Sequence, residues 1–417
     1  MSPRCANRIT HGRTMRWTPD GKALIVTLPI LGRSMNTPES PPTGARLFAL
    51  PASRPPEQIQ FTNDARSGMR CVIVIDSTAR GPAFGGCRFA AYEDDQSALK
   101  DALRLARGMS MKNALANLPF GGGKAVILRP RAPHDRRELF AAYGHAVASA
   151  GGRYITAEDV GSTAADMLVV QRETAFVSGV PRDGAFGGDP SPSTALGVFI
   201  AIEETLQRRQ HTVRDSTIAI QGLGAVGMAL AERLHDAGAR LVVADIDAAR
   251  TAEAAARLDA TVVDADRILF EPCDVLAPCA LGAVLDAESI PRLRAAIVCG
   301  AANNQLAEAQ DGDLLHARGV LYLPDFVVNA GGVISVAREY LGVRDRSDVA
   351  REIALIGQRV HDLLDRCGHS SPARTADAWA LDRLNEAAAG GPPNGYPIPY
   401  RSASTHAGCP PAEHAVA

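Results

Sequence analysis

The stretch Thr217-Ile-Ala-Ile-Gln-Gly222-Leu-Gly-Ala-Val-Gly227 decides the fold, because it passes from an apolar strand through a glycine-rich turn into a helix. Gly222 permits the tight turn, Gly224 lets a phosphate approach the backbone, and Gly227 lets helix and strand pack closely. The helix N-terminus supplies free N–H groups and partial positive charge for an anion. The motif predicts a dinucleotide site. The alternative is a glycine-rich turn in a sheet that binds another ligand.

An acidic residue at the end of the next strand indicates which dinucleotide binds. Asp245 follows the glycines by about 20 residues, where a carboxylate accepts hydrogen bonds from the ribose hydroxyls and repels a 2′-phosphate. We therefore expect NAD rather than NADP as the cofactor. The residues predicted to hold its adenosine and pyrophosphate are Gly222, Leu223, Gly224, Ala225, Val226, Gly227, Asp245 and Ile246.

Strands and helices alternate strictly around this motif, which builds a parallel sheet covered on both faces. Here strands are predicted at residues 217–220, 241–244, 275–276, 296–298 and 320–322, and helices at 194–208, 225–237 and 248–258. Earlier in the chain the pattern is mixed. The strands predicted there cover residues 71–76, 124–128 and 154–156, and the helices cover 96–109 and a segment from about 164.

These patterns predict an α/β protein of two domains. An N-terminal mixed α/β substrate domain precedes a doubly wound Rossmann domain that binds NAD, and C-terminal helices pack back on the first domain. The predicted divisions are a disordered extension (1–45), the substrate-binding and catalytic domain (46–185), the NAD-binding domain (186–335), a C-terminal helical segment (336–390) and a disordered tail (391–417).

Composition excludes several classes of function. The 417 residues carry a formal net charge of −2, whereas a nucleic-acid partner calls for a basic surface, and no apolar run is long enough to span a membrane. The eight cysteines are scattered without a C-x-x-C pair, which predicts reduced thiols in a cytoplasmic protein. The histidines show no ligand spacing, so we expect no metal.

Two of only four lysines are candidates for catalysis. Lys112 follows the helix predicted at 96–109, and Lys124 follows a predicted loop at 119–123 that ends in three glycines. Lysine, unlike arginine, can lose its proton when it is desolvated or placed beside another cation. The glycines would leave room for a ligand near Lys124. The alternative is a pair of surface lysines.

Asp159 lies just past the strand predicted at 154–156, where open α/β sheets place ligand-binding groups. Taken alone, this carboxylate could equally cap a helix.

The chain also resembles the glutamate/leucine/phenylalanine/valine dehydrogenase family, and its leucine and phenylalanine branch in particular. The matching motifs appear in family order between about residues 61 and 342. They are Gly81-Pro-Ala-Phe-Gly-Gly-Cys-Arg88, Leu118-Pro-Phe-Gly-Gly-Gly-Lys-Ala-Val-Ile127, Tyr154-Ile-Thr-Ala-Glu-Asp-Val-Gly161, Pro278-Cys-Ala-Leu-Gly282, Gly300-Ala-Ala-Asn-Asn304 and Pro324-Asp-Phe-Val-Val-Asn-Ala-Gly-Gly332.

The resemblance implies roles for individual residues. Lys124 matches the catalytic lysine, Lys112 matches the lysine that binds the substrate α-carboxylate, and Asp159 matches the acid that handles protons on the substrate amine. Gly85 and Gly86 would help to bind the carboxylate, Thr194 and Asn303 would contact the nicotinamide end of the cofactor, and Phe84, Ala157, Val333 and Val336 would line the side-chain pocket. Two departures are Phe84, where a Leu or Ala is usual, and Cys87, where a Thr is usual.

The implied reaction is the reversible NAD-dependent oxidative deamination of a hydrophobic L-amino acid to the 2-oxo acid, ammonia and NADH by a homo-oligomer. The charge of Lys112 would depress the pKa of Lys124, which could then act as a general base. The apolar pocket disfavours glutamate. Leucine, isoleucine or valine is the first choice and phenylalanine or tryptophan the alternative. A catalytically silent NAD-binding regulator is the remaining alternative.

Overall fold

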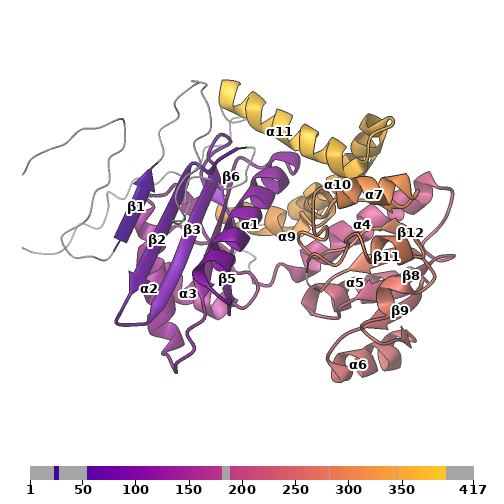
Figure 1. Cartoon of the computed structure of the whole chain (residues 1–417), viewed down its shortest axis with the longest axis horizontal. Helices are drawn as coiled ribbons and strands as arrows, with labels where there is room; N and C mark the ends of the chain where they lie inside the picture. Colours follow the sequence, from indigo (N-terminus) through magenta and orange to yellow (C-terminus); the bar gives the residue numbers. More distant parts are fainter. Residues whose placement is uncertain (1–22, 28–53, 181–187, 281, 344, 391–417) are drawn as a thin grey trace, which may run out of the picture.

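The computed structural model describes residues 23–27, 54–180, 188–280, 282–343 and 345–390. Two α/β domains lie side by side, with a helical segment above and between them (Figure 1). None of the described helices is long and apolar enough to cross a membrane. The predicted tail at 391–417, and residues 1–22 and 28–45 of the predicted extension, lie outside the described residues.

The first domain is built on one mixed sheet whose strands run in the order β1-β2-β3-β6-β4-β7, with β5 also paired to β6. Its elements after β1 are β2 Gln58–Asp64, β3 Met69–Ser77, β4 Ala83–Phe84, β5 Cys87–Ala90, α1 Asp95–Leu115, β6 Gly121–Leu128, α2 Arg136–Ser149, β7 Tyr154–Ile155 and α3 Ala164–Glu173. Strands β4 and β5 run parallel to β6, whereas β3 runs antiparallel to it.

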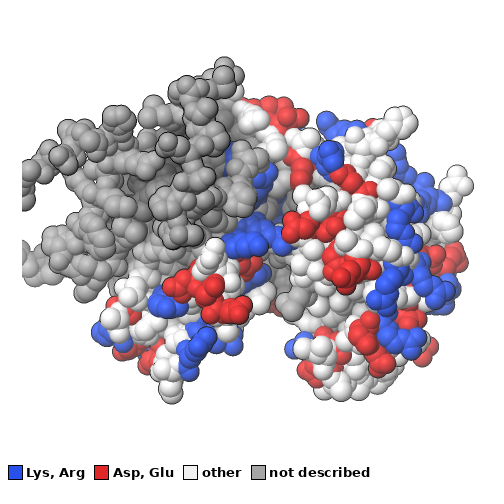
Figure 2. All heavy atoms as spheres, viewed as in Figure 1, with Lys and Arg blue, Asp and Glu red and all other residues white. Residues whose placement is uncertain are grey.

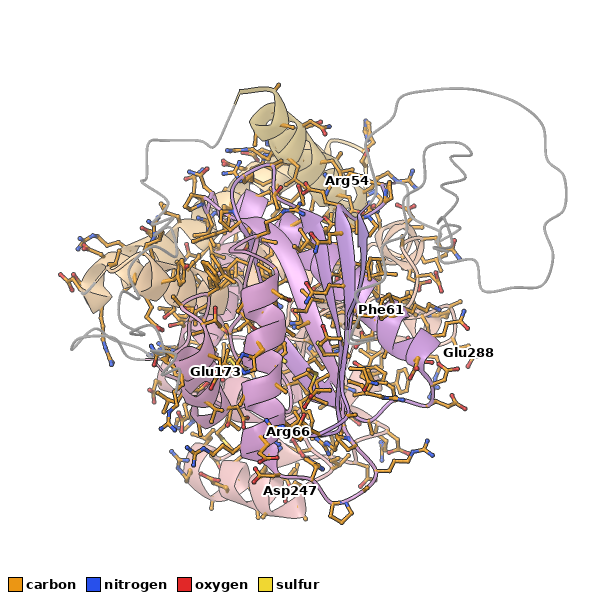
Figure 3. The ribbon with its side chains drawn as sticks, turned by 90° about the vertical axis from the view of Figure 1, so that its left-hand side faces the viewer. Arg54, Phe61, Arg66, Glu173, Asp247 and Glu288 are labelled. Atoms are coloured by element: carbon orange, nitrogen blue, oxygen red, sulfur yellow. The ribbon has the colours of Figure 1, made fainter. Side chains whose placement is uncertain are left out.

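Helices cover both faces of this sheet, because successive side chains of its strands point to opposite sides. Ala98, Ala102 and Ala106 recur every four residues along α1 and pack against Val72 and Val74 of β3. Helices α2 and α3 cover the other face. The side view in Figure 3 shows Phe61 and Glu173 on opposite sides of the sheet. The small alanine face lets α1 lie close to the strands.

The three glycines before Lys124 belong to strand β6, so the loop predicted at 119–123 is wrong for Gly121 to Gly123. A Cβ atom on Gly122 would overlap the backbone of Ser110 in α1, and one on Gly121 would overlap the carbonyl of Ser77. The sequence predicted that these glycines form a loop with room for a ligand near Lys124. Their function in the fold is close packing of backbone against backbone.

Residues 23–27, which the sequence reading placed in a disordered extension, form strand β1 (Ala23–Thr27). This strand pairs antiparallel with β2, with Ala23 opposite Thr62 and Thr27 opposite Gln58. The extension therefore contributes an edge strand to the sheet. The apolar run from Ala23 to Ile30 is separated from its partner by the 30 residues between Thr27 and Gln58, so no local pattern indicated this pairing.

The second domain is the predicted doubly wound unit, with a parallel sheet in the order β10-β9-β8-β11-β12-β13. Its elements are α4 Ser191–Arg208, β8 Thr217–Gln221, α5 Ala225–Asp236, β9 Arg240–Ala244, α6 Ala248–Leu258, β10 Thr261–Val262, β11 Cys273–Pro278, β12 Ala295–Val298, α7 Asp311–Ala317, β13 Leu321–Tyr322, α8 Asp325–Val328 and two short 3₁₀ helices, Ile268–Phe270 and Ile290–Arg292. The chain order reverses across β8, which places the turn after β8 at a topological switch point.

The C-terminal helices α9 (Gly331–Tyr340), α10 (Arg346–Cys367) and α11 (Pro372–Gly390) connect the domains as expected. Helix α9 crosses the predicted boundary between residues 335 and 336. Helix α10 packs on α4 of the second domain, and α11 packs on α1 of the first. The hydroxyl of Ser178 donates to the carbonyl of Val336 at 2.6 Å, so α9 is also bonded to the first domain.

Gly122→Ala should destabilise the protein by about 1–3 kcal/mol or more, since the added methyl forces α1 and β6 apart. Gly108→Ala is the matched control, because a Cβ on Gly108 meets nothing within 4 Å and alanine favours the helix by up to about 1 kcal/mol. Urea denaturation of both variants measures the difference. Equal stabilities would mean that the glycines are not needed for close packing.

Candidate active site

A cleft of about 930 Å³ opens between the two domains. Figure 2 shows the notch between the lobes, with positive and negative side chains interspersed on the visible described surface. The predicted residues that line this cleft are Phe84, Gly85, Gly86, Lys112, Lys124, Ala157, Asp159, Thr194, Gly224, Ala225, Val226, Asn303, Val333 and Val336. The predicted residues outside its lining are Gly222 and Leu223 in the turn after β8, Gly227 in the first turn of α5, and Asp245 and Ile246 after β9.

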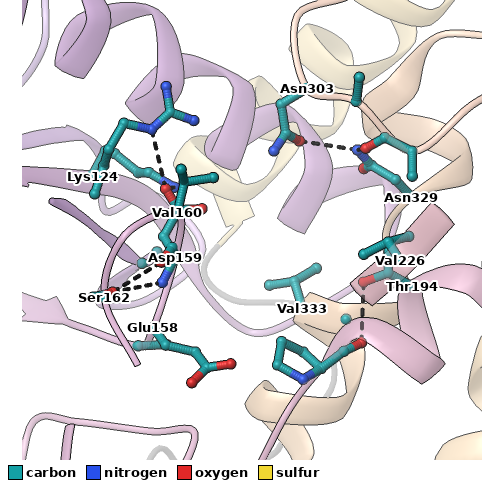
Figure 4. A pocket seen from close by; sticks show the side chains of 18 of the residues that line it. Lys124, Glu158, Asp159, Val160, Ser162, Thr194, Val226, Asn303, Asn329 and Val333 are labelled. Carbon is teal, nitrogen blue, oxygen red and sulfur yellow. Dashed lines mark hydrogen bonds and ion pairs between the residues drawn. The ribbon is translucent and has the colours of Figure 1, made fainter. Parts of the chain in front are cut away.

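Lys124 and Asp159 form a buried ion pair at the first domain's wall of the cleft (Figure 4). The Nζ atom of Lys124 lies 3.0 Å from Oδ2 of Asp159, and the two side chains are only 4% and 15% exposed. Burial alone would raise the pKa of Asp159, but the charges of Lys124 and Arg88 bring it below its ordinary value. Asp159 is therefore held as a carboxylate.

The backbone around Asp159 is fixed by its own short turn. The Asp159 N–H donates to the hydroxyl of Ser162 at 2.9 Å, and Ser162 N–H donates back to the Asp159 carbonyl at 3.0 Å. Gly161 has a φ of +83°, and a Cβ there would overlap the carbonyl of Phe89. The Glu-Asp-Val-Gly sequence thus presents Asp159 to the cleft, and Asp159 does not cap a helix.

Lys112 lies within α1, which runs six residues beyond its predicted end at 109. Its Nζ donates to Oδ1 of Asn303, across the cleft, at 3.0 Å. Burial lowers the pKa of Lys112 to about 8, because Asp325 offsets only part of the desolvation and the charge of Lys124 adds to it. Lys112 is therefore a buried amine that loses its proton not far above neutral pH.

Gly85 and Gly86 bring bare backbone into the same wall. A Cβ on Gly86 would lie 2.5 Å from the carbonyl of Glu158, and one on Gly85 would overlap the carbonyl of Gly123. The Tyr154 hydroxyl donates to the Gly85 carbonyl at 2.6 Å. These contacts hold the backbone near Lys124 in one position.

An apolar subsite adjoins the lysines. Ala157, Val333 and Val336 are all buried and line the cleft with Phe84. The Phe84 ring is 1% exposed and packs 4.9 Å from the ring of Phe120, centroid to centroid. It is therefore fixed within the core and forms a rigid boundary of the subsite.

The turn after β8 has the geometry of a phosphate-binding loop. Gly222 has a φ of +93°, a Cβ on Gly227 would overlap the Gly222 carbonyl, and a Cβ on Gly224 would meet nothing within 4 Å. No side chain caps the N-terminus of α5. Asp245 accepts from the Leu223 N–H at 2.6 Å, which ties the acid to the turn. A dinucleotide pyrophosphate fits the open side of Gly224.

Two further residues were predicted to contact the cofactor: Thr194 at its nicotinamide end, and Ile246 beside Asp245 at its adenosine end. Thr194 lies in the first turn of α4, where its hydroxyl donates to the Pro190 carbonyl at 3.2 Å. Ile246 is 96% exposed and offers an apolar surface next to Asp245, the acid predicted to bind the ribose.

The sequence reading missed two polar residues of the cleft. Arg88 was quoted in a motif but given no role, and its Nε lies 3.4 Å from Oδ2 of Asp159. Asn329 was likewise quoted in a motif without a role, yet its Nδ2 donates to Oδ1 of Asn303 at 3.0 Å (Figure 4). The only sequence signal for Arg88 was its position two residues after the Gly85–Gly86 pair. Across the described ranges, no group of three or more His, Cys, Asp or Glu is placed to hold a metal ion.

Comparisons with known proteins match both domains. The family model described as Glu/Leu/Phe/Val dehydrogenase, dimerisation domain, matches residues 56–176, and the model described as Glutamate/Leucine/Phenylalanine/Valine dehydrogenase matches residues 188–250 and 243–354. Leucine dehydrogenase of Bacillus subtilis is 42% identical over 79% of this chain and 91% of its own length. Valine dehydrogenase of Streptomyces coelicolor is 46% identical over 79% and 93%.

A solved structure also shares the fold. The crystal structure of L-tryptophan dehydrogenase from Nostoc punctiforme is 37% identical, covers 80% of this chain and 96% of its own chain, and gives a TM-score of 0.66.

The affinity for a branched 2-oxo acid, which has no amine to titrate, should fall as the pH rises through about 8. Lys112 is charged below that pKa and neutral above it, so the carboxylate loses its partner. The dissociation constant should rise several-fold between about pH 7 and about pH 9. Lys112→Arg stays charged and should show a flat profile. Identical profiles for the two proteins would remove Lys112 from carboxylate binding.

Proposed function

The chain belongs to the glutamate/leucine/phenylalanine/valine dehydrogenase family and is an amino-acid dehydrogenase, and on that premise we propose that it oxidatively deaminates a branched-chain L-amino acid with NAD. The observation that carries the proposal is the buried Lys124–Asp159 pair beside Lys112 and an apolar subsite in one cleft.

Lys112 binds the α-carboxylate of the substrate. It is a buried cation at the wall of the cleft, and desolvation strengthens its attraction for an anion. Gly85 and Gly86 line the same wall, so their backbone would lie beside the bound carboxylate. This contact anchors the substrate and places its α-carbon next to Lys124.

Lys124 acts as the base that takes a proton from the attacking water, and Asp159 handles the protons of the substrate amine. A proton on Lys124 has Oδ2 of Asp159 as an acceptor 3.0 Å away, so the pair can exchange protons directly. No hydrogen bond among the described residues engages Oδ1 of Asp159, which leaves that oxygen for the amine. Release of ammonia then yields the 2-oxo acid.

The residues of the second domain fit a dinucleotide. Bound NAD would supply the hydride acceptor. The turn at Gly222 and Gly224 would hold the pyrophosphate, Thr194 and Asn303 would contact the nicotinamide end, and Asp245 would accept hydrogen bonds from the ribose. Arg250 lies 3.7 Å from Asp245 and 3.4 Å from Asp247, so its charge is paired already, which supports NAD over NADP.

The apolar subsite supports a branched substrate. Ala157, Val333 and Val336 offer no cation for a second carboxylate, and burying an unpaired carboxylate is costly. The fixed Phe84 ring reduces the available volume, which favours valine, leucine or isoleucine. The aromatic alternative is supported by the small Ala157 and by the likeness to L-tryptophan dehydrogenase. The relatives, all named as dehydrogenases, speak against a silent regulator.

We further propose a homo-oligomer assembled through the first domain, since the family model over residues 56–176 is described as a dimerisation domain. The cytoplasmic location predicted from the cysteines stays a prediction. The six cysteines in the described ranges are free thiols.

An initial-rate panel of amino acids with NAD and with NADP tests the proposal. Valine, leucine and isoleucine should give the highest kcat/KM with NAD, and glutamate should give none. Lys124→Ala should lower kcat by a factor of about 10² to 10⁴, because it removes the base. A folded Lys124→Ala variant with near-normal kcat would exclude Lys124 from the mechanism. A preference for NADP or glutamate in the wild-type protein would contradict the proposed cofactor or substrate.

Phe84→Ala should raise kcat/KM for phenylalanine relative to leucine by roughly tenfold or more, because removing the ring frees volume that a larger side chain needs. The Phe84 ring already packs on Phe120 and has 1% exposure, so space-filling should outweigh stacking on a substrate ring. Competition between the two substrates measures the ratio. A lower ratio would show that Phe84 stacks on aromatic substrates, and an unchanged one that it does not line the pocket.

A further inference from the structure

Asp159 has a second cationic partner that the proposed reaction does not use. Arg88 points its Nε at Oδ2 of Asp159 from 3.4 Å, and this is the same oxygen that Lys124 approaches to 3.0 Å. Both cations therefore act on one carboxylate oxygen. Within the described part of the chain, the other oxygen accepts no hydrogen bond.

Strand β5 directs the side chain of Arg88 towards Asp159. Cys87 and Phe89 are buried in the core, whereas Arg88 between them faces the cleft, because alternate residues of a strand point to opposite sides. The Cys87 N–H donates to the carbonyl of Ala157 at 2.8 Å, so β5 runs alongside the segment that leads into Asp159. The neighbouring backbone thus fixes the distance between Arg88 and Asp159.

The other end of the guanidinium is held by α1. Arg88 Nη1 donates to Oδ2 of Asp101 at 2.9 Å, and the Tyr92 hydroxyl donates to the same oxygen at 2.5 Å. Asp101 lies 11 residues before Lys112, or about three helical turns, so both occupy one face of α1. The helix that carries the carboxylate-binding lysine also anchors Arg88.

We propose that Arg88 is a positioning residue that keeps Asp159 ionised and its second oxygen free for the substrate amine, with Asp101 and Tyr92 holding Arg88 in place. The inference rests on the proposed role of Asp159. The Arg88 and Asp159 side chains are 19% and 15% exposed, so their attraction is only weakly screened by water. Arg88 bridges two carboxylates, which orients its guanidinium as well as its charge.

Loss of Arg88 should change the charge of Asp159 in a defined direction. Burial raises the pKa of Asp159 and the surrounding cations lower it, so removing one cation raises the pKa. The carboxylate would then be protonated at a higher pH than in the wild-type protein. The charged or titratable groups that face Asp159 are Lys124, Lys112, Arg88, Glu158, Cys87 and Tyr154.

The test compares pH profiles of amino-acid deamination. Arg88→Met should lower kcat by about tenfold or more and move the acid limb of kcat to higher pH, while the amino-acid KM changes less than about twofold because Lys112 is intact. Arg88→Lys should return the acid limb towards its wild-type position. Asp101→Asn keeps the charge of Arg88 but loosens it, so kcat should fall without movement of the limb to higher pH.

The matched control is Arg153→Met, which breaks an ion pair with Glu57 in the same domain, at 3.0 Å, away from the cleft lining. It should leave the pH profile unchanged. If Arg88→Met does not fold, Tyr92→Phe provides a milder test, and kcat should fall a few-fold at constant KM. A Tyr92→Phe variant equal to wild type would then overturn the proposal.

Asp159→Ala, measured alongside, separates the two hypotheses. If Asp159→Ala is nearly inactive while Arg88→Met keeps the wild-type kcat and acid limb, the inference about Arg88 is wrong and the role of Asp159 stands. If Asp159→Ala is nearly as active as wild type, the proposed role of Asp159 is wrong, and that of Arg88 with it. Equal losses in Arg88→Lys and Arg88→Met without any shift of the limb would reduce Arg88 to a structural role.

Discussion

The contact between helix α1 and strand β6 is the constraint on which the site depends. Backbone meets backbone at Gly122 and Ser110, which is possible only because β6 begins without side chains. The side chain of Asn113 in α1 stabilises this contact, because its Nδ2 donates to the carbonyls of Gly121 at 2.6 Å and Phe84 at 3.2 Å. The close approach brings Lys112 on the helix to the wall of the cleft that Lys124 on the strand also lines.

Burying two lysines together is unfavourable unless acids compensate. Desolvation and the nearby charge of Lys124 favour the neutral amine of Lys112 and lower its pKa. The compensating carboxylates come from separate segments, with Asp159 after β7 and Asp325 at the start of α8. Burial raises the pKa of Asp325, which is offset only in part by Lys112. Lys112 and Asp325 are therefore both shifted towards their neutral forms.

The features that could be predicted from the sequence are those that depend on local sequence patterns. The glycine turn, Asp245 and the strand–helix alternation follow from short-range rules, and the structure has a parallel sheet with Gly222 and Gly224 in the predicted turn. The sequence did not predict contacts between distant segments. The strand character of Gly121 to Gly123 depends on packing against α1, and the position of Arg88 depends on pairing with residues about 70 positions away. The roles of Lys124 and Asp159 came from family resemblance, since spacing alone left alternatives open.

The same helix also connects the two domains, so a ligand that binds Lys112 would be coupled to the position of the domains. Arg104 donates to the carbonyls of Asn304 and Leu306, and Lys112 donates to the side chain of Asn303, all in the loop after β12 of the second domain. A carboxylate that binds Lys112 competes with Asn303 for the ammonium protons. Asn303 still accepts from Asn329, so it can give up Lys112 without leaving its oxygen unpaired. The loop after β12 would thus change its bonding when a carboxylate binds Lys112.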